Sequence, residues 1–102
     1  MMKTLTVISD GKPITWQIDE NYLTIINCFD DEKNRAYKIY HHIMWKSISE
    51  IYFSEPYYSD DSCTGGINVT AGHDNSIGYP VSSEAEAREF YLELLKKVGE
   101  CK

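Results

Sequence analysis

The stretch Ser83–Val98 constrains the fold most strongly, because it carries the pattern of an amphipathic helix. Its apolar residues recur at three- and four-residue intervals: Ala87, Phe90, Tyr91, Leu94, Leu95 and Val98. Ser83 followed by Glu86 fits a capping box, and Gly99 is the residue type that commonly follows a helix C-terminus. We therefore expect one C-terminal helix whose apolar face is buried against the rest of the chain.

Alternating apolar and polar residues predict antiparallel strands before this helix. The expected strands are Thr4–Ser9, Ile14–Ile18, Tyr22–Phe29, Ala36–Ile43, Ile67–Ala71 and Ile77–Val81, with Gly72–Ser76 as a turn. Both faces of Tyr22–Phe29 carry bulky residues, so this strand should be central. Met44–Phe53 fits either a helix or a strand, and we favour a strand from about Ser49, where Ile, Tyr and Phe dominate.

These elements predict one α+β domain over residues 1–102, with a C-terminal helix packed on an antiparallel meander of about five to seven strands. The helix should cover the face that holds Trp16, Ile18, Leu23 and Ile25. The order of strands followed by one helix resembles the pleckstrin-homology-like superfold. This resemblance concerns topology alone, so it implies a fold and no function.

Charge and cysteine content narrow the classes of function. The net charge is −6, from 16 acidic and 10 basic residues, which disfavours direct binding to nucleic acid or to anionic membranes and favours a basic protein partner. Cys28, Cys63 and Cys101 are widely spaced and form no CxxC motif, which indicates free thiols in a reducing compartment. With no signal-peptide pattern, we expect a cytoplasmic protein.

No catalytic, metal or cofactor motif stands out. His41 and His42 are adjacent in an expected strand, so their side chains should point to opposite faces. The spacing of Cys63, His73 and Asp61 matches no metal motif, and we expect no metal or cofactor. A small hydrolase that uses Cys63 as nucleophile and His73 as base remains an alternative, although we do not expect an enzyme.

Ser54–Gly66 has no regular pattern and is long for a loop in a compact domain, which is typical of a functional loop. Tyrosine offers a large contact area at low entropy cost, and aspartate offers adaptable hydrogen bonds. The candidate partner-binding residues in this loop are Tyr57, Tyr58, Asp60 and Asp61. The alternative is that both tyrosines fold back over the sheet edge.

An acidic stripe runs along the outer face of the expected helix, formed by Glu86, Glu89 and Glu93. Neighbours at this spacing are about 5–6 Å apart at Cβ, which is similar to the spacing of phosphates along one nucleic-acid strand. Such a stripe can take the place of a nucleic-acid backbone in the basic groove of a protein partner. The alternative is a solvated helix face without a partner.

The sequence therefore predicts a small, non-enzymatic binding protein that occludes a basic, nucleic-acid-binding surface of a protein partner. In size and charge the chain resembles small phage-encoded inhibitors of host defence such as anti-CRISPR proteins. The main alternative is a structural domain that self-assembles as a homodimer through a sheet edge.

Overall fold

The chain folds into two antiparallel sheets and one helix, as a computed structural model shows for residues 3–9, 11–59, 62–78 and 84–100. For residues 9, 56–59, 62–64 and 84 only the backbone is described. The elements are β1 (Lys3–Ser9), β2 (Lys12–Ile18), β3 (Tyr22–Asp30), β4 (Ala36–Met44), the 3₁₀ turn η1 (Trp45–Ser47), β5 (Glu50–Ser59), β6 (Ser62–Thr70), β7 (Asp74–Ile77) and α1 (Glu84–Glu100). The α+β architecture predicted from the sequence is confirmed.

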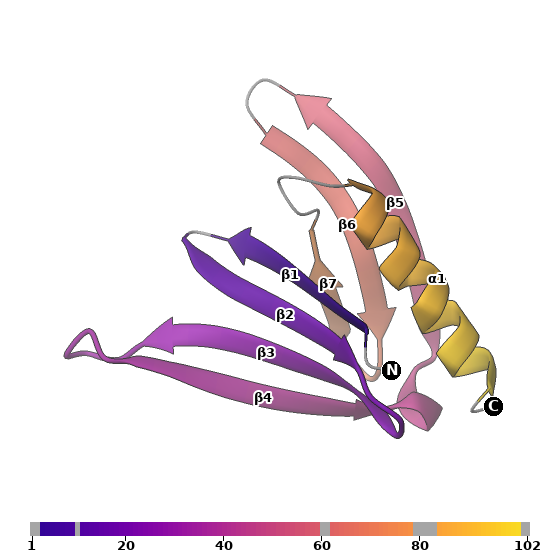
Figure 1. Cartoon of the computed structure of the whole chain (residues 1–102), viewed down its shortest axis with the longest axis horizontal. Coiled ribbons are helices and arrows are strands. Elements are labelled where there is room, and N and C mark those ends of the chain that lie inside the picture. The colour runs from indigo at the N-terminus through magenta and orange to yellow at the C-terminus, as the bar shows by residue number, and fades with distance from the viewer. Residues whose placement is uncertain (1–2, 10, 60–61, 79–83, 101–102) are drawn as a thin grey trace.

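The first sheet has the order β1-β2-β3-β4 and the second the order β5-β6-β7 (Figure 1). In the first sheet Leu5 lies opposite Trp16, Trp16 opposite Ile25, and Ile25 opposite His41, so one row of side chains crosses all four strands on one face. β3 lies between β2 and β4, as expected for the strand with bulky residues on both faces. The segment before β5 turns through η1, and β5 begins at Glu50, one residue from the predicted start.

The segment Ser54–Gly66 is not the irregular loop that the sequence predicted. Its two ends belong to β5 and β6, which pair with each other along their length (Figure 1). The register shifts between Ser54 and Tyr57, where Pro56 supplies no backbone N–H for a ladder hydrogen bond. The bulge and the two glycines opposite it, Gly65 and Gly66, interrupt the alternation of apolar and polar residues. The sequence pattern therefore does not predict the hairpin.

Two further boundaries differ from the sequence prediction. The last strand is Asp74–Ile77 rather than Ile77–Val81, because the turn is tight: the Ala71 amide donates to the His73 carbonyl oxygen at 3.1 Å, and Gly72 has φ +86°. Residues 79–83 lie outside the described part of the chain, and so does Ser83, the residue predicted to cap the helix. At the other end α1 continues through Gly99 to Glu100, so Gly99 does not end the helix.

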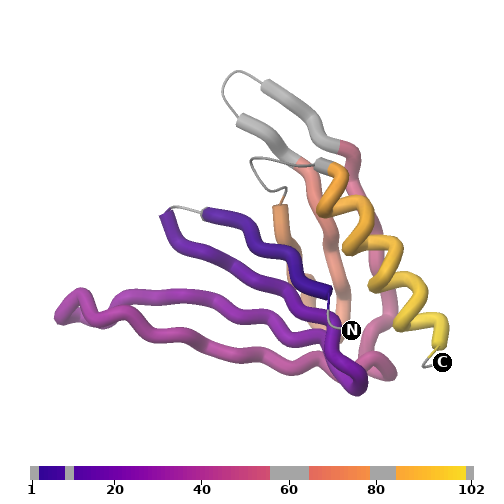
Figure 2. Tube along the Cα trace, in the orientation of Figure 1, coloured from indigo at the N-terminus to yellow at the C-terminus, as the bar shows by residue number. Residues whose placement is uncertain are grey.

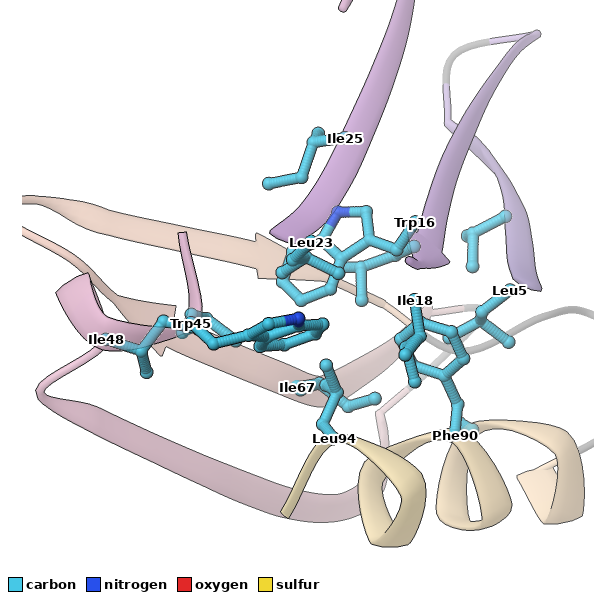
Figure 3. Close-up of a cluster of buried hydrophobic side chains, with 14 residues drawn as sticks. Leu5, Trp16, Ile18, Leu23, Ile25, Trp45, Ile48, Ile67, Phe90 and Leu94 are labelled. Atoms are coloured by element: carbon cyan, nitrogen blue, oxygen red, sulfur yellow. The ribbon is translucent and has the colours of Figure 1, made fainter. Parts of the chain in front are cut away.

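The core lies where the two sheets and α1 meet (Figure 3). The helix contributes Ala87, Phe90 and Leu94, which are buried against side chains from both sheets and from η1. The sheets contribute Leu5, Val7, Trp16, Ile18, Leu23, Ile25, Ile67, Val69 and Ile77, and the connection between them contributes Trp45 and Ile48. The four residues expected beneath the helix all belong to this core. Leu95, which the predicted stripe included, is exposed.

The backbones of the two sheets diverge away from this core (Figure 2). The β3–β4 hairpin projects furthest, beyond the end of β1 and β2 (Figure 2). At its tip Asn34 adopts φ +59°, and the Asp31 side chain accepts hydrogen bonds from the amides of Lys33 and Arg35, both at 2.8 Å. The loop is therefore ordered by hydrogen bonds between its own amides and the Asp31 side chain.

Candidate functional site

The acidic stripe predicted on the helix lies on a face of α1 that is presented to solvent. Glu86 and Glu89 are exposed, whereas Glu93 is half-buried. Their positions follow from the burial of Ala87, Phe90 and Leu94, which fixes the rotation of the helix about its axis. Glu89 also lies 4.0 Å from the Lys3 ammonium, a contact between exposed groups that contributes little stability.

Glu93 also lines a cleft of about 490 Å³ between α1 and the turn that joins β2 to β3. The other lining residues are Ile18, Asp19, Glu20, Lys96, Lys97 and Glu100. Four acidic and two basic residues thus line the cleft. Sequence reasoning missed this site, because Asp19 and Glu20 are far from the helix in the sequence and looked like ordinary turn residues.

The Asp19 carboxylate is held in a fixed position beside Gln17 and Thr24, on the face of the first sheet that these two residues share. It accepts hydrogen bonds from Gln17 Nε2 at 3.0 Å and from Thr24 Oγ1 at 2.5 Å. Thr24 Oγ1 also lies 3.1 Å from His42 Nδ1, so the arrangement reaches β4 across β3. Because its side chain is already held in place, Asp19 loses less conformational entropy on binding a cationic group than a carboxylate on a flexible loop would.

The tyrosine candidates lie in the outer part of the β5–β6 hairpin, beyond the register shift. The backbone of Tyr57 pairs with Thr64 and that of Tyr58 with Cys63, so both tyrosines belong to β5. Asp60 and Asp61 lie outside the described residues. For Tyr57 and Tyr58 the structure describes the backbone alone.

Cys63 and His73, the alternative nucleophile and base, lie at opposite ends of β6. Cys63 is near the start of this strand, and His73 follows its end at Thr70. At about 3.3 Å per residue, the strand from Cys63 to Thr70 spans roughly 23 Å. This distance is far greater than the hydrogen-bond reach that a nucleophile and its base require.

His73 instead lines a cleft to which the other two histidines also contribute. His41, His42 and His73 line a cleft of about 300 Å³ between β4 and the β6–β7 turn, together with Ser47 and Asn75. Over the described ranges, no group of three or more histidine, cysteine, aspartate or glutamate side chains has the arrangement of a metal site. The register places His41 and His42 opposite Ile25 and Thr24, on the two faces of the sheet, as the sequence predicted.

Asp31 is the titratable group whose environment is most distinctive. Hydrogen bonds from the Arg35 amide, the Arg35 guanidinium at 2.7 Å and the Lys33 amide stabilise the carboxylate and lower the pKa of Asp31 below its ordinary value. These contacts all lie within the β3–β4 loop. They therefore serve the shape of the hairpin tip rather than a reaction.

Several large apolar side chains are exposed on the β3–β4 hairpin. They are Phe29, Tyr37, Ile39, Tyr40 and Met44. Phe29 and Tyr37 stack with ring centroids 5.7 Å apart. Because a small domain rarely exposes several such residues on neighbouring strands without a role, this hairpin is a second candidate interaction surface.

Comparison of the chain with protein-family models, with curated proteins and with solved structures found no match. Within the described residues no helix is both long enough and apolar enough to cross a lipid bilayer.

Proposed function

We propose that this chain is a non-enzymatic binding protein that occludes a basic, nucleic-acid-binding surface of a protein partner. The observation that carries the proposal is the position of Glu93, which belongs both to the helix stripe and to the cleft beside Asp19. We call the combined set the acidic surface: Asp19, Glu20, Glu86, Glu89, Glu93 and Glu100.

Acidic residues outnumber basic ones at the acidic surface, among the residues that the structure describes. The described contacts and the cleft lining place three lysines beside its six acidic residues: Lys3, Lys96 and Lys97. Arg88 lies on the same helix, but its guanidinium contacts the Glu55 carboxylate at 3.1 Å. Local charge of this kind attracts a basic surface and speeds its association.

The spacing of the acidic groups supports a partner that normally holds nucleic acid. Glu86, Glu89 and Glu93 follow one another at successive turns of a rigid helix, with intervals of about 5–6 Å at Cβ. A groove shaped for regularly spaced phosphates finds a similar series of negative charges here. The small inhibitors of host defence that the chain resembles in size and charge would act in this way.

Competition with nucleic acid tests the proposal. Proteins captured from a lysate of the source cells by the immobilised chain would be purified and offered a labelled DNA or RNA duplex. We expect the chain to displace the duplex at near-stoichiometric concentration and to bind more weakly as salt rises, because screening acts over about 8–10 Å. Simultaneous binding of the chain and the duplex would refute the proposal.

A charge-matched pair of variants separates the acidic surface from net charge. Glu89→Gln with Glu93→Gln changes the charge from −6 to −4, and so does Glu32→Gln with Glu50→Gln at exposed positions elsewhere. We expect the first pair to weaken binding about tenfold or more and the second to leave it within about twofold. Equal weakening by both pairs would show that only total charge matters.

A further inference from the structure

Strand β4 is a long sheet edge that no strand among the described residues covers. It pairs with β3 from Ala36, opposite Asp30, to Met44, opposite Tyr22, without a bulge. Its other side faces no strand in the part of the chain that the structure describes, and α1 packs near β1 at the opposite edge of this sheet (Figure 1). Natural proteins usually protect such edges with proline, bulges or charge, and β4 has one lysine and no proline.

The register shows which backbone groups of β4 are directed outward. The Asp31 amide donates to the Arg35 carbonyl oxygen at 3.0 Å, which makes these two residues a hydrogen-bonded pair. Because such pairs alternate along an antiparallel ladder, the odd-numbered residues of β4, such as Ile39, bond to β3. The even-numbered residues therefore direct their N–H and C=O groups to the free edge: Ala36, Lys38, Tyr40, His42 and Met44.

We propose that β4 pairs in an antiparallel arrangement with β4 of a second copy of this chain, around a two-fold axis at Tyr40. In this register Tyr40 lies opposite its own counterpart, Lys38 opposite His42, and Ala36 opposite Met44. Every outward-directed residue of the strand then finds a partner. The two four-stranded sheets join into one continuous sheet.

The symmetry of the strand favours a second copy over an unrelated strand. Tyr40 is the central residue of β4, and it is also one of the residues whose backbone groups point outward. A two-fold axis at this position therefore uses the whole length of both strands. Two identical strands therefore pair over their full length, and no unrelated partner with a complementary sequence is needed.

Charge opposes self-pairing least at this edge. Two chains that each carry −6 repel one another, but β4 contains no acidic residue, so the repulsion is weakest here. The two Lys38 side chains start four residues apart along the paired strands, which is about 13 Å and beyond the screening length near physiological salt.

Pairing would cover apolar surface on both faces of the sheet. Tyr37 and Ile39 are exposed on the face that carries Ile25, and Tyr40 and Met44 on the other. The second strand places Ile43 beside Tyr37 and brings the two Tyr40 rings together. Cross-strand pairs of aromatic and β-branched residues stabilise antiparallel sheets.

The mass in solution tests this proposal, which does not depend on the acidic surface. Sedimentation equilibrium should give twice the chain mass of 11.8 kDa. Tyr40→Lys places two ammonium groups opposite each other and should raise the dimer dissociation constant about tenfold or more. Ile8→Lys is the matched control on β1, since Ile8 is 55% exposed and Tyr40 56%, and it should remain dimeric.

Disulfide trapping tests the register separately. Residues in a hydrogen-bonded antiparallel pair have Cα atoms about 5.5 Å apart, within disulfide range. Tyr40→Cys should therefore give a covalent dimer on mild oxidation, whereas Lys38→Cys should give no more than the unmodified chain, which controls for the native cysteines. A monomeric mass for the folded chain, or equal crosslinking of both variants, would overturn the proposal.

Discussion

The indole Nε1 of Trp45 donates a hydrogen bond to the backbone carbonyl oxygen of Asp19 at 3.1 Å. Trp45 lies in η1, the short segment that connects the two sheets, and Asp19 begins the turn between β2 and β3. The buried indole packs among side chains of both sheets and α1 (Figure 3). This contact therefore fixes the connection between the sheets and also the position of the Asp19 backbone at the acidic surface.

Trp45→Phe should lower the free energy of unfolding by about 1–3 kcal/mol, because the carbonyl of Asp19 loses its donor and a small cavity forms. Urea denaturation followed by circular dichroism measures the change. An unfolding midpoint equal to that of the unmodified chain would show that the hydrogen bond and the indole packing contribute nothing.

Leu94→Ala should cost about 2–5 kcal/mol, the usual range for a buried leucine. Leu94 is fully buried, whereas Leu92 on the same helix is 58% exposed. Leu92→Ala is therefore the matched control and should change stability by less than about 0.5 kcal/mol. Similar melting temperatures for the two variants would contradict the observed docking of α1.

Gly66→Ala should destabilise the second sheet by about 3 kcal/mol or more. Gly66 has φ +141°, and a Cβ there would lie 2.1 Å from the Ile77 carbonyl oxygen, so β6 or β7 would have to move. Gly72→Ala is the control, since Gly72 has φ +86° but open space around it. Chemical denaturation should rank Gly66→Ala as clearly the more damaging change, and the reverse order would count against the β6–β7 pairing.

The Asp31 carboxyl should titrate below the ordinary range of aspartate in a pH series of carbon-detected NMR spectra. The folded-state pKa is lowered chiefly by the Arg35 amide and further by the Arg35 side chain and the Lys33 amide. The stabilisation is therefore complete above the unfolded-state pKa and disappears as pH falls through the folded-state pKa. Arg35→Ala should raise the pKa only part of the way, because the amide remains; an unchanged value would exclude any contribution of the guanidinium.

Periodicity predicted the elements whose environment is uniform along their length. The helix was found from the spacing of Ala87, Phe90 and Leu94, and the strands of the first sheet from residues such as Trp16 and Ile18 that alternate between a buried and a solvated face. These patterns reflect local geometry, since a helix repeats every 3.6 residues and a strand every two.

Features that depend on distant parts of the chain could not be predicted in this way. The hairpin of β5 and β6 was hidden because Pro56 and two glycines interrupt its alternation. The division into two sheets depends on the turn at Trp45, and the cleft depends on how α1 lies beside Asp19 and Glu20. Within the candidate site, the sequence pattern predicts the glutamates of the helix. It does not predict Asp19 and Glu20, which line the cleft beside them.

The position of α1 in the chain has a consequence for biosynthesis. Strands β1–β7 leave the ribosome first, but Ala87, Phe90 and Leu94 fill the centre of the core. Until residues 84–100 have emerged, the nascent chain carries two sheets whose apolar faces are open to solvent and to other chains. The core can therefore form only after the helix has been translated. Chaperones would bind the nascent chain at the earlier stage, when the strands are present without the helix.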